Sequence, residues 1–249
     1  VQQPDGSWVL NGTKTFITQG SVAGTYVILA VTDPAKKQKG ITAFIVERGT
    51  PGFRAGRKLE KMGLHASDTA ELILEDVRVP DSQRLGPVDR GFIDTLRILD
   101  KGRITIAAMA LGLGQGAYEA ALRYARERKQ FGRPIADFQA IQNMLAQSAM
   151  ELDASWLLIQ RAAWLCDQGQ RFTHQASMGK LYAAQAAMRA CDRAVQIHGG
   201  YGYTREFPVE KALRDAKLCE IGEGTNEIQR LVISRELLGH GQLVVSGIV

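Results

Sequence analysis

The spacing of apolar residues changes once along this chain, near residues 81–92. Up to about residue 85, apolar residues come in short runs bounded by Gly, Pro and Asp, which is typical of β-strands. After Pro87 they recur every three to four residues over long stretches, which is typical of amphipathic helices. The sequence therefore predicts an α+β protein with two domains, residues 1–86 and residues 87–249.

The first domain is expected to contain strands at residues 7–10, 13–18, 26–31, 41–46 and 72–80. The first two of these runs flank Asn11-Gly12, a pair that predicts a β-hairpin because both residues tolerate positive φ. Several short strands separated by turn residues indicate a partial antiparallel β-sandwich or barrel.

The second domain is expected to begin with three long helices, at about residues 91–128, 137–169 and 173–196. Shorter helices are predicted after Pro208 and Thr225, because proline suits a first helical turn and threonine suits an N-cap. Several long helices in succession indicate an antiparallel up-down helix bundle.

Composition is that of a globular protein. Of 249 residues, 45% are hydrophobic and 23% are charged. No run of eighteen uncharged apolar residues occurs, so we expect no transmembrane helix. The first residues lack both an initiator Met and the features of a signal peptide, which suggests a piece of a longer protein.

The formal net charge of +5 comes from basic residues scattered along the chain. A solvated surface explains this pattern, and attraction of anionic cofactors or substrates stays open. Nucleic-acid binding is not expected, because no basic patch is interleaved with aromatic residues. Cys166, Cys191 and Cys219 match no disulfide or metal spacing and are predicted to be reduced core residues of a cytoplasmic protein. His198 has no partner at metal spacing, so no metal site is expected.

Glu223 lies between Gly222 and Gly224, where one predicted helix ends and another begins at Thr225. The glycines allow the backbone to approach a ligand, and the start of the new helix offers free N–H groups. A carboxylate in this position can act as a general base. The alternative is a surface glutamate in a glycine-rich turn, which the spacing alone favours.

Residues 196–200 form a second candidate segment, because they end a long helix with two adjacent glycines. Backbone N–H groups at such glycines can bind a pyrophosphate, although a glycine that only stops the helix fits equally well. Arg128 ends the first long helix and could pair with a phosphate. A cation at a helix C-terminus is also favourable by itself, so this assignment stays open.

Gly112, Gly114 and Gly116 have a spacing similar to part of a dinucleotide-binding fingerprint. They lie inside a helical pattern, no strand precedes them, and the third glycine of the fingerprint is missing. We interpret them as glycines that allow close helix packing, and we expect no Rossmann fold.

Taken together and in this order, the motifs from about residue 5 to residue 239 resemble the acyl-CoA dehydrogenase family. The ordered set is highly specific, whereas each motif alone is weak. Its members are Phe16-Ile17-Thr18, Lys61-Met62-Gly63-Leu64, Asp100-Lys101-Gly102-Arg103, Arg128-Lys129-Gln130-Phe131-Gly132, Gln139-Ala140-Ile141-Gln142, Gln196-Ile197-His198-Gly199-Gly200, Glu223-Gly224-Thr225 and Ile228-Gln229-Arg230.

The resemblance implies an FAD enzyme that oxidises an acyl-CoA thioester to the trans-2-enoyl-CoA. It implies that Glu223 removes the α-proton while hydride passes from the β-carbon to flavin N5. The backbone N–H of Glu223 and a ribityl hydroxyl would stabilise the forming enolate. It further implies a homotetramer, or at least a dimer, and an electron-transfer flavoprotein as electron acceptor.

The resemblance also assigns ligand-binding positions. Beside the flavin ring it places Phe16, Ile17 and Thr18. Flavin contacts in the same subunit would come from Thr225, Asn226 and Glu227. The adenosine diphosphate part of a neighbouring subunit's FAD would contact Arg128, Gln139, Gln196, Ile197, His198, Gly199 and Gly200. Substrate-binding positions are matched by Asp100, Arg103 and Gly224.

Departures from the family pattern refine these expectations. Gly102 occupies the position where some members that act on branched or longer chains carry their base, so the base is expected at Glu223. The pattern Asp100-x-Gly102-Arg103 resembles short-chain members and favours short to medium acyl groups. Gly222 stands where other members carry Tyr, which leaves the shape of the pocket beside the thioester open.

The family's N-terminal helical domain and the first strands of its β domain have no counterpart here, so an N-terminally truncated chain is expected. The bacterial cytoplasm, or the mitochondrial matrix of a eukaryote, is the implied location. Two alternatives stay open: a flavin acyl-CoA oxidase-like relative, and a non-catalytic helical scaffold that has lost the N-terminal domain.

Overall fold

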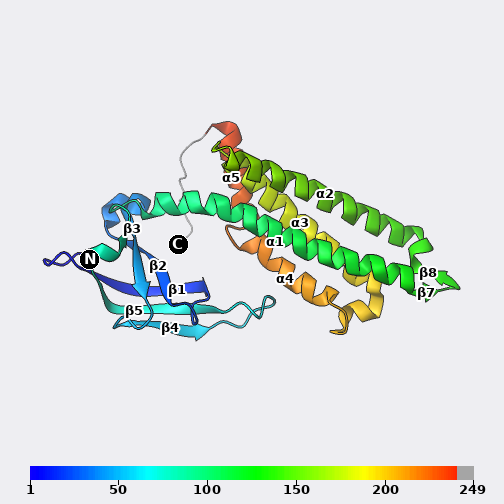
Figure 1. The fold of residues 1–249 in the computed structure, drawn as a ribbon, viewed down its shortest axis with the longest axis horizontal. Helices are drawn as coiled ribbons and strands as arrows, with labels where there is room; N and C mark the ends of the chain where they lie inside the picture. Colours follow the sequence, from blue (N-terminus) through cyan, green and yellow to red (C-terminus); the bar gives the residue numbers. More distant parts are fainter. Residues whose placement is uncertain (240–249) are drawn as a thin grey trace. The chain divides into compact units, whose positions relative to one another are not determined.

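The protein, analysed as a computed structural model, is described over residues 1–239. The chain divides into two compact units, Val1–Ile98 and Leu99–Val249. The first unit contains the two larger sheets. The second contains most of the helical residues and a short antiparallel strand pair, β7 (Lys129–Gln130) and β8 (Arg133–Pro134) (Figure 1).

The first unit is built from two antiparallel three-stranded sheets, in the orders β1-β5-β4 and β2-β3-β6. The strands are β1 (Trp8–Thr18), β2 (Thr25–Val31), β3 (Ile41–Glu47), β4 (Phe53–Lys58), β5 (Thr69–Val79) and β6 (Arg84–Leu85). Both sheets contribute to one core, in which the ring centroids of Trp8 and Phe44 lie 5.3 Å apart. The predicted antiparallel sandwich is therefore confirmed.

The hairpin predicted at Asn11-Gly12 is wrong. Strand β1 runs through both residues and pairs with β5 on either side of a register shift between Leu10 and Gly12. Across the shift, the Asn11 amide donates to Asp76 Oδ1 at 2.9 Å, and Asn11 Oδ1 accepts from the Asp76 backbone N–H at 2.7 Å. The positive φ of Gly12, 139°, therefore serves a β-bulge and not a two-residue turn.

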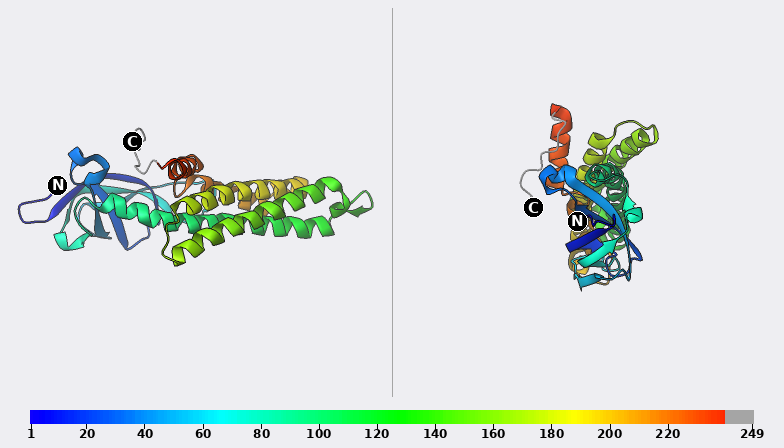
Figure 2. Two further views of the ribbon diagram at one scale, coloured as in Figure 1. Left: turned by 90° about the horizontal axis from the view of Figure 1, so that it is seen from above. Right: turned by 90° about the vertical axis from the view of Figure 1, so that its left-hand side faces the viewer.

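The predicted helices are present to within a few residues at each end. They are α1 (Gly91–Glu127), α2 (Gln139–Asp167), α3 (Thr173–His198), α4 (Val209–Ile221) and α5 (Asn226–Leu238). Thr225 is the N-cap of α5, and its side chain accepts from the Ile228 backbone N–H at 3.3 Å. Within the second unit, α1, α2, α3 and α4 lie side by side with alternating directions (Figures 1 and 2), which confirms the predicted bundle.

Helix α3 is the centre of the bundle and packs against α2, α4 and α5. Its buried face is rich in alanine, including Ala183, Ala184 and Ala187. A Cβ added to Gly114 of α1 would lie 2.8 Å from Leu152 Cδ2 and 3.0 Å from Ala187 Cα, so this glycine allows close packing. The same interpretation is wrong for Gly112 and Gly116, because a Cβ there would meet no atom of residues 1–239 within 4 Å.

The three cysteines are free thiols, as predicted, with Cys191 and Cys219 buried and Cys166 half-buried. Burial raises the pKa of the Cys191 thiol to about 12 and that of Cys219 to about 11. They are therefore inert core residues. Among the described helices, none is long and apolar enough to cross a membrane.

Candidate active site

Glu223 lies in a short turn, residues 222–225, between α4 and α5. Its φ is 56°, and that of Gly224 is 87°. A non-glycine residue in the left-handed region costs on the order of 1–3 kcal/mol, so the surrounding structure must hold this turn. A Cβ on Gly224 would lie 2.8 Å from Gln229 Nε2, and the positive φ would strain any residue with a Cβ, so both features favour glycine there.

The Glu223 carboxylate lies against α1 at Gly102. A Cβ added to Gly102 would be 2.5 Å from Glu223 Oε2 and 3.1 Å from Cδ. Oε2 is buried and has no hydrogen-bond partner among residues 1–239. Buried polar atoms without a partner are rare in folded proteins, so this oxygen is a candidate for accepting a proton from a ligand.

Arg103, which is buried, and Asp100, which is half-buried, form an ion pair beside Gly102. Arg103 Nη1 donates to Asp100 Oδ1 at 2.6 Å and to Ser177 Oγ at 3.4 Å, and the Thr173 hydroxyl donates to Asp100 Oδ2 at 2.6 Å. Arg103 Nε is buried without a partner in the described part of the chain. Both Asp100 oxygens are therefore engaged within the protein, whereas Arg103 retains one unused donor.

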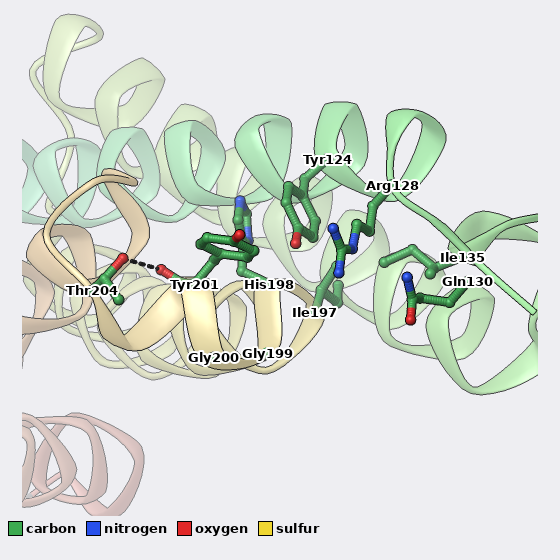
Figure 3. Close-up of a pocket in the computed structure, with 10 residues that line it drawn as sticks. All are labelled: Tyr124, Arg128, Gln130, Ile135, Ile197, His198, Gly199, Gly200, Tyr201 and Thr204. Carbon is green, nitrogen blue, oxygen red and sulfur yellow. Dashed lines mark hydrogen bonds between the residues drawn. The ribbon is translucent and has the colours of Figure 1, made fainter.

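A separate pocket of about 460 Å³ lies between the end of α1 and the segment that follows α3. Figure 3 shows Tyr124 of α1 and Arg128, directly after α1, extending toward His198, at the end of α3, and Tyr201. The lining residues are Tyr124, Arg128, Gln130, Ile135, Ile197, His198, Gly199, Gly200, Tyr201 and Thr204. The structure thus brings together Arg128 and four of the five residues 196–200.

Aromatic rings form one wall of this pocket. The Tyr124 and His198 rings stack with centroids 4.2 Å apart, and the Arg128 guanidinium lies 5.8 Å from the Tyr201 ring centroid. His198 is buried and its Nδ1 lies 2.8 Å from the Ala194 carbonyl oxygen. Burial lowers the pKa of His198, which favours the neutral ring.

Gly199 and Gly200 form the open side of the pocket. Gly199 has φ 60° and ψ −134°, a conformation that residues with a Cβ rarely adopt. A Cβ on either glycine would meet no atom within 4 Å in the described residues. Exposed backbone next to a guanidinium and aromatic faces suits a phosphate-containing nucleotide.

Two other predicted cofactor residues lie outside the pocket lining. Gln139, the first residue of α2, and Gln196 are both exposed. Sequence reasoning missed lining residues that the structure adds, namely Tyr124, Gln130, Ile135, Tyr201 and Thr204. For Tyr124 a signal existed, because it precedes Arg128 by four residues and so shares its helix face.

Thr225, Asn226 and Glu227 line a different cavity of about 170 Å³, which also includes Lys217 and Arg230. The Thr225 hydroxyl caps α5, while Asn226 is buried and Glu227 is exposed. Hydrogen bonds from its own backbone N–H and from Thr225 lower the pKa of Glu227. With Glu220 also in its lining, the cavity presents two anionic and two cationic side chains beside a helix N-terminus.

Phe16, Ile17 and Thr18 end strand β1 in the first unit. Phe16 is 76% exposed and has φ 57°, at a second register shift between Lys14 and Ile17. Ile17 packs against the sandwich core, and Thr18 is exposed. An exposed aromatic ring on strained backbone is unusual for a structural strand residue, and such strain concentrates at functional sites.

Two domain families match the sequence. The middle domain of acyl-CoA dehydrogenase matches residues 1–77, and the C-terminal domain of acyl-CoA dehydrogenase matches residues 89–238. These matches define the chain as a middle domain followed by a C-terminal domain of the acyl-CoA dehydrogenase type. More particularly, the chain belongs to the acyl-CoA dehydrogenase family, as the motifs predicted.

Individual relatives agree. The chain is 53% identical to the probable acyl-CoA dehydrogenase YngJ of Bacillus subtilis over 232 residues. The aligned region is 93% of this chain and 61% of that protein. It is 47% identical to the caffeyl-CoA reductase-Etf complex subunit CarC of Acetobacterium woodii, over 93% of this chain and 61% of that one. The solved structure of butyryl-CoA dehydrogenase from Megasphaera elsdenii superposes with a TM-score of 0.94 at 46% identity, covering 95% of this chain and 62% of that one. The chain therefore spans about three fifths of the length of these relatives.

Proposed function

We propose that the protein carrying this chain is an FAD-dependent acyl-CoA dehydrogenase, with Glu223 as the catalytic base. Its product would be the trans-2-enoyl-CoA of a short- to medium-chain acyl-CoA. The observation that carries the proposal is the buried, unpaired Oε2 of Glu223, held on a strained turn against Gly102. The similarity to a butyryl-CoA dehydrogenase supports a short acyl group.

In this proposal, Glu223 removes the proton from the α-carbon of the thioester. Its unpaired oxygen is not neutralised by a protein donor, which keeps it available to the carbon acid. The backbone N–H of Glu223 donates to the thioester carbonyl oxygen and stabilises the charge that develops there. FAD, when bound beside these residues, would supply the acceptor for the hydride that leaves the β-carbon.

The residues around the site have matching roles. The flavin ring would lie beside Phe16, Ile17 and Thr18, and near Thr225, Asn226 and Glu227. The adenosine diphosphate part would be held by Arg128, Gln139, Gln196, Ile197, His198, Gly199 and Gly200 of a neighbouring subunit, a role that the nucleotide-like pocket supports. Substrate would contact Gly224 and the Asp100–Arg103 pair, where Arg103 Nε offers the unused donor.

We further propose that residues 1–86 are part of the middle β domain and residues 87–249 the C-terminal helical domain. The family matches to residues 1–77 and 89–238 support this division, as does the compact unit that ends at Ile98.

A homo-oligomer, with a dimer of dimers as the arrangement, also belongs to the proposal. Its support is an apolar stripe on α2, defined here as Met150, Leu157 and Trp164. These side chains are 59%, 61% and 57% exposed and recur every seven residues, which places them on one helix face. An electron-transfer flavoprotein is proposed as the electron acceptor, supported by a relative that is a subunit of an Etf complex.

Substitution of the base tests the proposal. We expect Glu223→Gln, in the longest native protein that contains these residues, to lower acyl-CoA oxidation about 100- to 10,000-fold, because the amide cannot take the α-proton. The measurement is the bleaching of the flavin absorption by a panel of acyl-CoAs of increasing chain length. The matched control is Glu119→Gln, an exposed glutamate on α1.

Bleaching at the wild-type rate in Glu223→Gln would refute the assigned base. A protein that takes up no FAD would favour the non-catalytic scaffold. Rapid reoxidation of the reduced flavin by oxygen with product bound would favour an acyl-CoA oxidase.

A further inference from the structure

Lys180 of α3 is a fully buried lysine that no motif marked. Its ammonium donates to the Gly224 carbonyl oxygen at 2.8 Å and to Asn226 Oδ1 at 3.2 Å. Burying an ammonium group is costly unless hydrogen bonds compensate. Here both compensating acceptors belong to the segment that directly follows Glu223.

A second buried donor acts on the same turn. Gln229 of α5, also fully buried, donates from Nε2 to the Gly224 carbonyl at 2.9 Å and to the Glu223 carbonyl at 3.3 Å. The carbonyl groups of both positive-φ residues are therefore held by side chains from two helices. A turn that is strained by itself persists because these donors fix it.

The surroundings of Lys180 include titratable groups from three other helices. Cys219 and Glu220 face it from α4, Glu227 from α5, and Arg103 from α1. Burial lowers the pKa of the Lys180 ammonium to about 8, even though the acidic neighbours raise it. The ammonium of Lys180 therefore loses its charge as pH rises through about 8.

We propose that Lys180 is a positioning residue for the base: its ammonium holds the Gly224 carbonyl and thereby keeps the Glu223 carboxylate against Gly102. The inference rests on the proposed role of Glu223 as the base. Lys180 has no contact with the proposed reacting atoms. It bonds to Gly224 and Asn226, which are themselves proposed ligand contacts, and so acts on the base through the turn that these residues belong to. A displacement of a catalytic group by about 1 Å can lower a rate about 100-fold, so this fixation has a measurable effect on turnover.

The test uses Lys180→Met, which keeps the length of the side chain and removes its donors, in the longest native holoenzyme that contains these residues. We expect kcat to fall about 100-fold with little change in the KM for acyl-CoA. We also expect faster backbone amide exchange confined to residues 222–226. Lys180→Gln, which keeps a neutral donor on a shorter side chain, should lie between wild type and Lys180→Met. The control is Lys39→Met, an exposed lysine in the first unit.

The pH profile supplies a readout that a general packing role would not change. In wild type, kcat should decline as pH rises through about 8, because the ammonium loses its charge. Lys180→Met should lack this decline.

Three outcomes would overturn the inference. The first is unchanged kcat and loop exchange in Lys180→Met while Glu223→Gln abolishes turnover. The second is faster exchange across all helices in both Lys180 variants, which would make Lys180 a general packing residue. The third is undiminished turnover in Glu223→Gln; this would refute the proposed base and with it the catalytic part of the inference, while loop exchange would still report whether Lys180 holds the turn.

Discussion

At the scale of single residues, the site depends on Gly102 having no side chain. Gly102 lacks the Cβ that would lie 2.5 Å from Glu223 Oε2, so the helix backbone itself forms the wall against which the carboxylate rests. The atom that would clash is the end of a flexible side chain, which can move at low energetic cost. A methyl group at this position would therefore displace the base without disturbing the fold.

We predict that Gly102→Ala lowers turnover at least about 10-fold while leaving thermal stability equal to or above that of wild type. Alanine is favoured over glycine inside a helix by about 1 kcal/mol, so the substitution stabilises α1 while it moves the carboxylate. Steady-state kinetics and a thermal melt of the same preparation check both parts.

Gly112→Ala is the matched control on the same helix, because its Cβ would meet no atom of the described residues within 4 Å. It should raise stability by a similar amount and leave turnover unchanged. Equal turnover in the two variants would contradict the proposed contact.

At the scale of secondary-structure elements, the bundle is held by the close approach of α1, α2 and α3. Gly114 of α1 faces Leu152 of α2 and Ala187 of α3 at distances that leave no room for a methyl group. Interiors packed at this density tolerate added volume poorly.

Gly114→Ala should therefore destabilise the fold by about 1–3 kcal/mol, despite the better helix propensity of alanine. Gly116→Ala, two residues further along the same helix, should instead stabilise it by up to about 1 kcal/mol, because its Cβ would be in open space. Chemical denaturation of both variants measures the two free energies of unfolding. The change in the free energy of unfolding should have opposite signs in the two variants. The same sign in both would contradict the packing argument.

The apolar stripe on α2 predicts a change in assembly. Leu157 is 61% exposed, so Leu157→Glu should change the stability of one subunit by less than about 0.5 kcal/mol. Placing a carboxylate in an apolar interface should nevertheless reduce the oligomer to a smaller species, because the charge would be desolvated there. Light scattering coupled to size-exclusion chromatography measures the mass. Gln170→Glu adds the same charge at an exposed position beyond the end of α2 and should leave the oligomer intact.

At the scale of the whole molecule, a buried ion cluster links global stability to pH. Glu151 of α2 accepts hydrogen bonds from Arg189 and Arg193 of α3 and from Gln147. Burial alone would raise the pKa of Glu151, but the hydrogen bonds from Arg193, Gln147 and Arg189 outweigh it and lower the pKa to about 2. The cluster therefore joins two long helices with a charge that persists far below neutral pH.

Because the pKa of Glu151 in the folded state is lower than its ordinary value of 4.5, its stabilisation is present above pH 4.5 and is lost as pH falls toward about 2. We predict that Glu151→Gln lowers the free energy of unfolding at pH 7 by on the order of 3 kcal/mol. The variant should also lose less stability than wild type between pH 5 and 2. Urea unfolding across that range checks both effects, and Glu119→Gln, at an exposed position, should behave as wild type.

Much of the fold could be predicted because the signals are local. The long helices follow from a period of three to four residues, and Thr225 caps α5 as its type suggests. Strand β4 was not predicted, because most of its residues are exposed or charged and show no apolar alternation. Asn11-Gly12 has the composition of a turn, but its polar groups pair with Asp76 on a strand more than sixty residues away.

Only some residues of the site could be predicted from the sequence. The family motifs marked Glu223, Arg128 and the glycines after α3, and the structure places these residues at a buried carboxylate and at a pocket. Lys180 gave no signal, because a lysine in a helical pattern ordinarily marks a solvated face. Its burial depends on the turn after α4 folding back over α3.

By itself, the sequence determined the order and type of the elements and the family, since periodicity, capping residues and ordered motifs are all encoded along the chain. Tertiary structure alone decided which groups meet: Glu223 with Gly102, and Lys180 with the Gly224 carbonyl. The physical reason is that local preferences involve neighbours within a few residues. The environment of a buried carboxylate or ammonium is instead supplied by helices that approach one another only when the core packs.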